Sequence, residues 1–222
     1  MRRLVIVRPE PGANATVAKA RGMGLEAVAI PLFKVEPVAW EAPKAGGFDG
    51  LLLTSANALR HGGEQLAALR GLPVYAVGGA TAEAARDAGF DIVGTGEAGV
   101  ERLLGSIDGE LRLLHLCGEH RTAVAAAQVI TAVPVYRSVE LPAPGGLGDI
   151  AGQVTAVHSP RAGQRLAELI GKAERATVRI AAISDAAAAA AGGGWAACEA
   201  AETPDDGALL ALAARLCDES GR

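Results

Sequence analysis

Short apolar runs alternate with longer amphipathic stretches along almost the whole chain, and this alternation constrains the fold more than any other feature. The pattern is typical of a parallel sheet that helices cover on both faces, so we predict an α/β fold. The strands that we expect are Leu4–Val7, Ala27–Ile30, Gly50–Leu53, Val74–Val77, Asp91–Val93, Leu111–Leu116, Val133–Tyr136, Val154–His158, Arg179–Ile183 and Trp195–Ala200. The helices that we expect are Asn14–Gly22, Ala56–Arg70, Thr81–Ala88, Val100–Ser106, Thr122–Ile130, Ala162–Ala173, Ala186–Ala191 and Gly207–Cys217.

The two halves of the chain resemble each other at a spacing of roughly 105 residues. The segment FDGLLLTSANAL aligns with QVTAVHSPRAG, which places Ser55 opposite Ser159. In the same way VYAVGGATAEA aligns with RIAAISDAAAA, and Gly78 falls opposite Ser184. The chain is therefore expected to form two similar parallel-sheet α/β domains.

Two prolines indicate where the chain passes between these domains. Pro31 and Pro134 each follow a strand-like run, and proline keeps the preceding residue extended while it removes one ladder hydrogen bond. The runs 34–38 and 135–141 can then pair as a two-stranded β-ladder hinge, with the chain crossing twice. The domains that we expect are 1–33 with 142–222, and 39–134, whereas the alternative is a tandem split near residue 110.

Charge and motif content exclude several classes of function. The chain has 21 Lys and Arg against 25 Asp and Glu, a formal net charge of -4, so no nucleic-acid partner is expected. The three cysteines form no C-x-x-C pair, and no nucleotide or zinc motif occurs, so we expect no cofactor and no metal. The N-terminal apolar run is too short for a signal peptide and no run is long enough to span a membrane, so we expect a cytoplasmic protein without a membrane partner.

Small polar residues follow most of the expected strands, at the edge where open α/β sheets bind ligands. A helix begins soon after each, so main-chain N–H groups and hydroxyls can face an anion that carries several carboxylates or phosphates. The alternative for Ser55, Ser159 and Ser184 is that they only cap helices. The candidate binding residues are Arg8, Thr54, Ser55, Ala56, Asn57, Gly78, Gly118, His158, Ser159 and Ser184.

Two further kinds of residue can complete such a site. Positive charge is available at or beside the strand ends, with solvated surface arginines as the alternative, from Arg8, Arg121, Arg137 and Arg161. Tyr136 lies in the expected hinge, where a phenol is a candidate proton donor and a packing role is the alternative. No Ser/His/Asp or Cys/His arrangement is evident from the spacing, so nucleophilic catalysis is not expected.

An ordered set of segments resembles the uroporphyrinogen-III synthase family. The segments are VIVRPEPG, AIPLFKVEP, LLLTSANAL, YAVGGATAEAARDAGF, LCGEHR, VPVYRSVEL and VHSPRAG, and they cover nearly the whole chain. The resemblance implies two α/β domains joined by a two-stranded ladder, in a monomer without a cofactor. It also implies an enzyme of tetrapyrrole (haem) biosynthesis that cyclises linear hydroxymethylbilane to uroporphyrinogen III, with loss of water and inversion of ring D through a spiro intermediate. The implied partners are this substrate and, in a transient hand-off, hydroxymethylbilane synthase.

The same resemblance implies roles for individual residues. Tyr136 matches the family tyrosine proposed to assist departure of the substrate hydroxyl, and Thr81 matches a threonine that lines the cleft. The positions whose amides or hydroxyls are implied to meet substrate carboxylates are Thr54, Ser55, Gly78, Ser159 and Ser184.

The sequence also departs from the family pattern. Ala187 stands where a threonine is usual, His158 where a threonine or similar residue is common, and Cys117 where arginine is frequent. A domain that has lost catalysis would show such changes. The alternative function is therefore a non-catalytic two-domain protein that binds an anionic small molecule.

Overall fold

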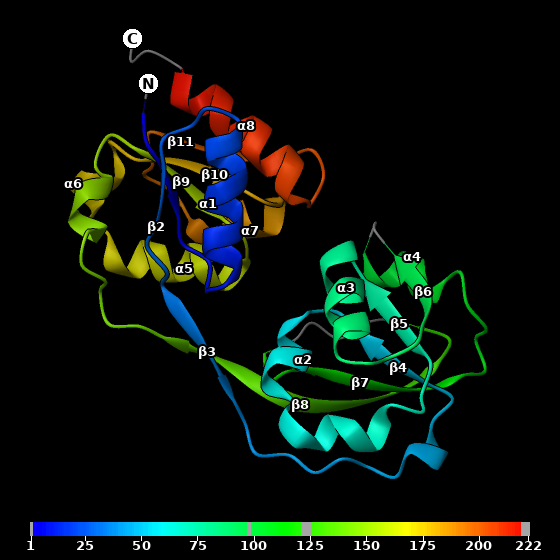
Figure 1. Cartoon of the computed structure of the whole chain (residues 1–222). Coiled ribbons are helices and arrows are strands. Elements are labelled where there is room, and N and C mark those ends of the chain that lie inside the picture. The colour runs from blue at the N-terminus through cyan, green and yellow to red at the C-terminus, as the bar shows by residue number, and fades with distance from the viewer. Residues whose placement is uncertain (1, 97–98, 121–125, 219–222) are drawn as a thin grey trace. The chain divides into compact units, whose positions relative to one another are not determined.

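The computed structural model describes residues 2–96, 99–120 and 126–218, and the chain divides into two compact units (Figure 1). Unit 1 is formed by Met1–Lys34 and Glu140–Arg222, and unit 2 by Val35–Val139. Each unit is built around a mostly parallel sheet flanked by helices, which confirms the predicted α/β fold class.

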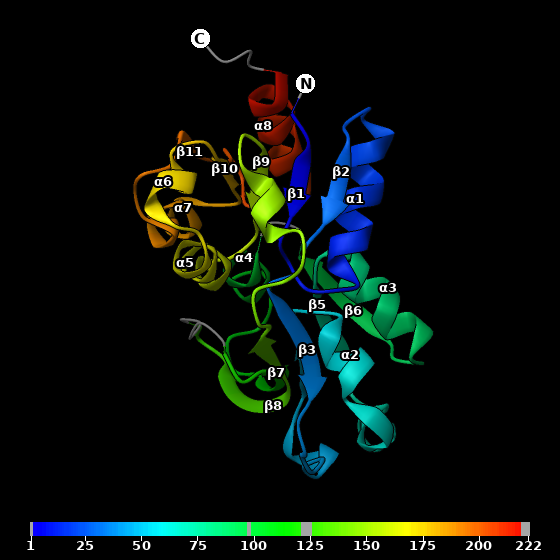
Figure 2. The ribbon, with the colours of Figure 1, turned by 90° about the vertical axis from the view of Figure 1, so that its left-hand side faces the viewer.

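Unit 1 contains a five-stranded parallel sheet in the order β11-β10-β9-β1-β2, whose succession can be followed in Figure 2. These strands are β1 (Leu4–Ile6), β2 (Ala27–Ala29), β9 (Val154–Val157), β10 (Arg179–Ala182) and β11 (Ala197–Ala200). The helices are α1 (Gly12–Gly22), α5 (Pro160–Leu169), α6 (Lys172–Arg175), α7 (Asp185–Ala191) and α8 (Asp206–Asp218), with a 3-10 turn at Leu147–Ile150. α1 and α8 pack in one apolar cluster and α5 and α7 in another, so buried side chains line the sheet on both faces.

Unit 2 contains a six-stranded sheet in the order β3-β8-β7-β4-β5-β6. Its strands are β3 (Phe33–Pro37), β4 (Gly50–Leu53), β5 (Val74–Val77), β6 (Ile92–Gly96), β7 (Arg112–Gly118) and β8 (Val129–Glu140). β4 to β8 pair in parallel. The helices are α2 (Asn57–His61), α3 (Gly79–Asp87) and α4 (Val100–Leu104), with 3-10 helices at Ala45–Gly47 and Gly63–Leu69.

The two sheets correspond strand by strand. β4, β5 and β6 begin 104, 105 and 105 residues before β9, β10 and β11, and both triplets lie on the same side of their sheets. Of the remaining strands of unit 2, β7 and β8 occupy the places that β1 and β2 occupy in unit 1, and β3 is an additional edge strand. The two sheets therefore have the same spatial order of strands, but the strand that comes first along the chain occupies a different place in each.

Several elements differ from the sequence prediction. The helix expected over 56–70 divides into α2 and a 3-10 helix, because Gly63 has a φ of +64° that an α-helix cannot include. The helix expected over 122–130 has its first residues outside the described part, and its last residues, Val129 and Ile130, begin β8. The predicted strand 133–136 and residues 135–140 of the second run belong to β8, which passes through Pro134 at an irregularity in its pairing with β7.

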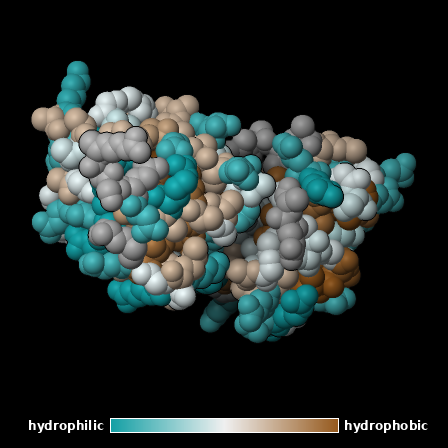
Figure 3. Space-filling model, turned by 90° about the horizontal axis from the view of Figure 1, so that it is seen from above, coloured by the Kyte–Doolittle hydropathy of each residue, from teal (hydrophilic) through white to brown (hydrophobic). Residues whose placement is uncertain are grey.

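The surface carries few large apolar side chains among the described residues. Met23, Val93 and Val129 are the large hydrophobic residues that are exposed, and they come from different parts of the chain. On the face drawn in Figure 3, hydrophilic residues cover much of the surface, with groups of hydrophobic ones between them. None of the described helices is long and apolar enough to span a membrane.

Candidate functional site

In unit 2 the structure places the phenol of Tyr136 over the end of β7. A Cβ atom on Gly118 would lie 2.8 Å from Cε2 and 3.3 Å from the hydroxyl oxygen of Tyr136, so only glycine leaves room for this ring. The side chain of Ser55, which follows β4, lies beside the phenol and acts to lower its pKa. Two residues at or just after strand ends, Ser55 and Gly118, are thus brought together with Tyr136 from within β8.

The protonation of Tyr136 follows from its surroundings. Burial raises the pKa of the phenol above its ordinary value of 10.0, and the contact with Ser55 opposes this only in part. The His61 ring lies 6.3 Å from the Tyr136 ring, centroid to centroid, and burial lowers the pKa of this histidine. The phenol of Tyr136 is therefore protonated at pH 7, beside an imidazole that is itself uncharged.

Thr54 is held by a residue that the sequence reasoning missed. Its Oγ1 lies 3.0 Å from Nε2 of His115, which is buried within β7. The signal was available, since a buried polar side chain inside an apolar strand needs a hydrogen-bond partner. This contact fixes the hydroxyl of Thr54 at the carboxyl end of β4.

The other candidates of unit 2 contribute chiefly through the main chain. Gly78 has a φ of +83° and precedes α3, whose start carries no cap from any described side chain. Thr81 is buried in the first turn of α3, and Ala56 is buried before α2. The Oδ1 atom of Asn57 accepts a hydrogen bond from Arg60 at 3.3 Å, so this side chain already has a partner.

In unit 1 the two candidate serines cap helices. The Ala162 N–H donates to Oγ of Ser159 at 3.2 Å, and the Ala187 N–H donates to Oγ of Ser184 at 3.3 Å. The capping role that was the alternative for these serines is therefore present. It leaves each hydroxyl proton free to be donated to another acceptor, so capping and anion binding are compatible. Ser55 differs, since its Oγ accepts the Asn57 N–H at 3.2 Å, two residues ahead, and the residue at the N-cap of α2 is Ala56.

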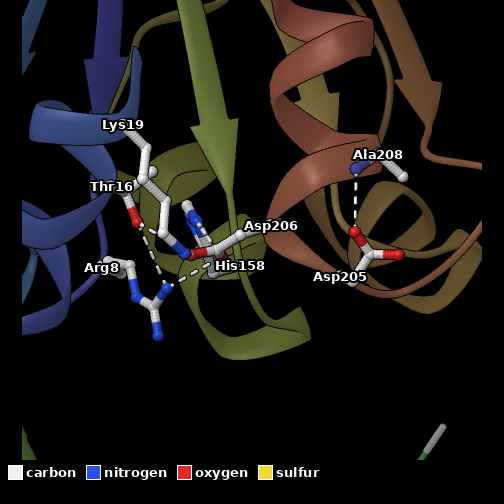
Figure 4. A network of polar contacts seen from close by, with 7 residues as sticks. All are labelled: Arg8, Thr16, Lys19, His158, Asp205, Asp206 and Ala208. Atoms are coloured by element: carbon white, nitrogen blue, oxygen red, sulfur yellow. Dashed lines mark hydrogen bonds and ion pairs between the residues drawn. The ribbon is translucent and has the colours of Figure 1, made fainter. Parts of the chain in front are cut away.

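Arg8 and His158 meet at the carboxyl edge of unit 1, around an acidic residue that the sequence reasoning missed (Figure 4). Arg8 follows β1 and His158 follows β9, and these neighbouring strands are where the sheet order reverses. Nη1 of Arg8 donates to Oδ1 of Asp206 at 3.1 Å, and Nε2 of His158 lies 3.5 Å from the same oxygen. Asp206 also accepts a hydrogen bond from Nζ of Lys19 at 3.2 Å.

The contacts and the burial of this cluster determine the protonation of Asp206 and His158. Contact with His158 and the charge of Arg8 hold the pKa of the Asp206 carboxyl well below its usual range, against the opposing effect of burial. Burial lowers the pKa of His158, whose ring is neutral at pH 7. At that pH the cluster combines two cations, Arg8 and Lys19, with one carboxylate, and it keeps a net positive charge.

The remaining arginines are engaged elsewhere or fall outside the described residues. Arg137 is ion paired with Glu36 at 3.3 Å, and the guanidinium of Arg161 lies 4.9 Å from the centre of the Phe33 ring. Arg121 lies outside the described residues. Among the residues that the structure describes, no group of three or more His, Cys, Asp or Glu side chains could hold a metal ion.

Comparisons with known proteins point to one family. The family model described as uroporphyrinogen-III synthase HemD matches residues 14–211. A uroporphyrinogen-III synthetase from Helicobacter pylori has a similar fold with a TM-score of 0.65 at 16% identity, covering 97% of this chain and 100% of that chain. A mutant uroporphyrinogen III synthase from the extremely thermophilic bacterium Thermus thermophilus gives a TM-score of 0.55 at 19% identity, covering 99% and 100%. No curated protein sequence matches the chain significantly.

Proposed function

We infer that this chain, which belongs to the uroporphyrinogen-III synthase family, is the enzyme that cyclises linear hydroxymethylbilane to uroporphyrinogen III. The observation that carries the inference is the family match over residues 14–211, which spans both units. Two uroporphyrinogen-III synthase structures with the same fold over nearly the full length support it. The enzyme releases water and acts in tetrapyrrole biosynthesis.

The reaction depends more on how the substrate is held than on acid–base assistance. Loss of the hydroxyl from the hydroxymethyl group of ring A, driven by the pyrrole nitrogen, gives an azafulvene. Ring D attacks this carbon through its own substituted α-carbon, and the spiro intermediate then fragments and recloses with ring D inverted. Because the unassisted reaction closes without inversion to the type I isomer, the enzyme must chiefly hold the bilane in the geometry that forms the spiro intermediate.

Tyr136 is the proposed proton donor. A hydroxyl group leaves readily only when it takes up a proton and departs as water. The phenol of Tyr136 stays protonated at pH 7 and is held between Ser55 and the bare backbone of Gly118. Its proton can therefore pass to the departing oxygen when the hydroxymethyl group lies at the end of β7.

Substrate carboxylates are proposed to bind at the carboxyl edges of the sheets. The bilane carries an acetate and a propionate on every pyrrole, which suits capped helix starts and hydroxyl groups more than an apolar pocket. In unit 2 the residues proposed for this role are Thr54, Ser55, Ala56, Asn57, Gly78, Thr81 and Gly118. In unit 1 they are Arg8, Ser159 and Ser184, with His158 contributing from behind Arg8 through its contact with Asp206.

Further properties are proposed from the family resemblance. The enzyme acts as a monomer in the cytoplasm, without a cofactor, and serves haem formation. It receives hydroxymethylbilane from hydroxymethylbilane synthase in a transient hand-off. The domains are proposed to be 1–33 with 142–222, and 39–134, with 34–38 and 135–141 as hinge strands. The hydrogen bond from Val38 N–H to Val135 O supports pairing of these runs, as does the adjacency of β3 and β8 in the sheet.

The isomer of the product tests the proposed function. Freshly generated hydroxymethylbilane is supplied with and without the protein, and the products are oxidised and separated by chromatography. We expect predominantly type III uroporphyrin with the protein and type I in buffer alone. Only type I product, formed at the buffer rate by folded protein, would overturn the proposal and leave the chain as a binding protein for an anionic small molecule.

A further inference from the structure

We propose that Asp206 is a positioning residue, which fixes the guanidinium of Arg8 at the carboxyl edge of unit 1 so that Arg8 binds a carboxylate of the substrate. The inference rests on the proposed function for the identity of that substrate. It adds a residue that lies in the first turn of α8, after the end of β11, and that none of the sequence motifs includes.

Arg8 is held from one side. Its Nη1 donates to Oδ1 of Asp206 at 3.1 Å and lies 3.4 Å from Oγ1 of Thr16, which itself lies 3.4 Å from Oδ2 of Asp206. The absent side chain of Gly12 makes room for this placement, because a Cβ atom there would lie 2.7 Å from Nε of Arg8. Every one of these contacts restrains the same arginine conformer.

The other side of the guanidinium is available. Nη2 of Arg8 makes no hydrogen bond with the described residues, and Figure 4 shows it directed away from Asp206. An arginine held through one nitrogen can still offer its remaining N–H groups to a carboxylate. Because the side chain is already ordered, less conformational entropy is lost when the ligand binds.

The side chains that support Arg8 are more buried than Arg8 itself. The side chains of His158 and Asp206 are 6% and 22% exposed, whereas those of Arg8 and Lys19 are 33% and 59% exposed. His158 and Asp206, with buried Thr16, thus form the back of the cluster, and both cations reach solvent. The groups that face Asp206 are Thr16 and Lys19 from α1, Arg8 after β1 and His158 after β9.

The structure also supplies a matched control. Asp205 is the preceding residue and carries the same charge, but its Oδ1 accepts the Ala208 N–H at 2.9 Å and its Oδ2 accepts the Thr203 hydroxyl at 2.6 Å. Figure 4 shows it apart from Arg8. Asparagine is as good a helix cap as aspartate, so Asp205→Asn removes one negative charge beside the start of α8 and leaves the support of Arg8 intact.

The test compares Asp206→Asn, Arg8→Ala, the double variant and Asp205→Asn. The quantities measured are KM and kcat for hydroxymethylbilane and the Kd for uroporphyrin I, a stable polycarboxylate. We expect Asp206→Asn to raise KM and Kd about tenfold with kcat nearly unchanged, as for loss of one charge-assisted contact. In the Arg8→Ala background the same change should have less than about a twofold effect, because the residue acts through Arg8. Asp205→Asn should stay within about twofold of the wild type on both quantities.

Three outcomes would overturn the positioning role of Asp206. If Asp206 instead competes with the substrate for Arg8, Asp206→Asn will lower KM and Kd, which overturns the proposal. Additive effects in the double variant overturn it as well. If Asp206→Asn does not fold, Asp206→Glu keeps the charge and moves the carboxylate by one methylene, and an unchanged KM in that variant is also contrary.

The two proposals fail separately. A wild type that forms only type I isomer refutes the proposed function, while uroporphyrin binding by the variants still decides the role of Asp206. A wild type that forms type III isomer with no effect of Asp206→Asn refutes only the positioning role. A chain that neither forms type III isomer nor binds uroporphyrin overturns both.

Discussion

At the scale of single residues, the placement of Tyr136 is possible because residue 118 is glycine and has no side chain. The nearest ring atom lies 2.8 Å from where a Cβ atom of Gly118 would be, and the irregularity of the β7–β8 pairing lies at the same point. Ser55 meets the phenol from β4, so three strands define the position of one hydroxyl group. A proton donor held in this way can act on a substrate oxygen only if the substrate is placed as accurately.

Tyr136→Phe tests how far the reaction depends on that proton. Since holding the bilane in the spiro-forming geometry is the larger effect, we expect kcat to fall about tenfold, roughly 1.4 kcal/mol of barrier, and type III to remain the main isomer. Turnover and isomer ratio are measured together on the folded variant. Complete loss of activity would show that proton donation is essential and that geometry is the lesser effect.

From the sequence, site residues were predicted by their position just after a strand. This approach finds contacts whose two partners are close together in the chain. The capping bonds of Ser159 and Ser184 reach three residues ahead. His115 and Asp206 were missed because their partners, Thr54 and Arg8, lie 61 and 198 residues away. Contacts of that range depend on which strands become neighbours, and local patterns do not record this.

At the scale of secondary-structure elements, α5 and α7 approach each other closely through a glycine. A Cβ atom on Gly163 would lie 2.7 Å from the carbonyl oxygen of Ala187 and 2.9 Å from the backbone nitrogen of Ala191. Ala187, the position where the family has a threonine, is fully buried. This position therefore belongs to helix packing as well as to the start of α7.

Gly163→Ala should weaken this packing. Because the obstacle is backbone and cannot rotate away, we expect a loss of about 1–3 kcal/mol in the free energy of unfolding, measured by urea denaturation. The control is Gly22→Ala, at the end of α1, where a Cβ atom meets nothing within 4 Å. That variant should be as stable as the wild type, and equal stability of the two variants would contradict the packing argument.

Strands were easier to predict than helices, for a physical reason. Parallel strands buried on both faces are continuous apolar runs, and the predictions Gly50–Leu53 and Val74–Val77 coincide with β4 and β5. The sequence around 122–130 is rich in alanine, which favours helix locally, yet Val129 and Ile130 pair with β7. Pairing with β7 therefore outweighs the local preference at Val129 and Ile130.

At the scale of the whole molecule, stability should depend on acid through a few buried groups. The depressed pKa values of His158 and His61 mean that the unfolded chain takes up protons first as the pH falls below about 6.5. The depressed pKa of Asp206 gives stability that is present above about pH 4 and is lost as the pH falls further. Asp49 and Asp205 act in the same direction in that lower window.

We therefore expect the free energy of unfolding to fall in two stages, below about pH 6.5 and again below about pH 4, when urea denaturation is repeated across this range. Asp206→Asn should flatten the second stage and extend the first to lower pH, because contact with Asp206 partly opposes the lowering of the His158 pKa. His158→Gln should flatten part of the first, with the share of His61 remaining. A profile that does not change in Asp206→Asn would mean that this carboxyl is not stabilised in the folded state.

The internal similarity predicted two similar units. It did not show that the order of the strands along the chain differs between the two sheets. The matching segments surround β4 and β5 in one unit and β9 and β10 in the other. β1 and β2, which complete the sheet of unit 1, precede all of these strands in the chain, whereas β7 and β8 follow β4 to β6. A repeat in sequence therefore does not reveal which strand the chain enters first.

The pairing of β1 with β9 has a consequence for synthesis on the ribosome. Leu4 is partnered by Val154, so the first strand made must wait until about 150 further residues have left the exit tunnel before its sheet can close. Val35–Val139, by contrast, is continuous, and all its strands are available earlier. Unit 2 can therefore complete its sheet while β1 and β2 still lack their neighbour β9, so the order of translation favours assembly of unit 2 before unit 1.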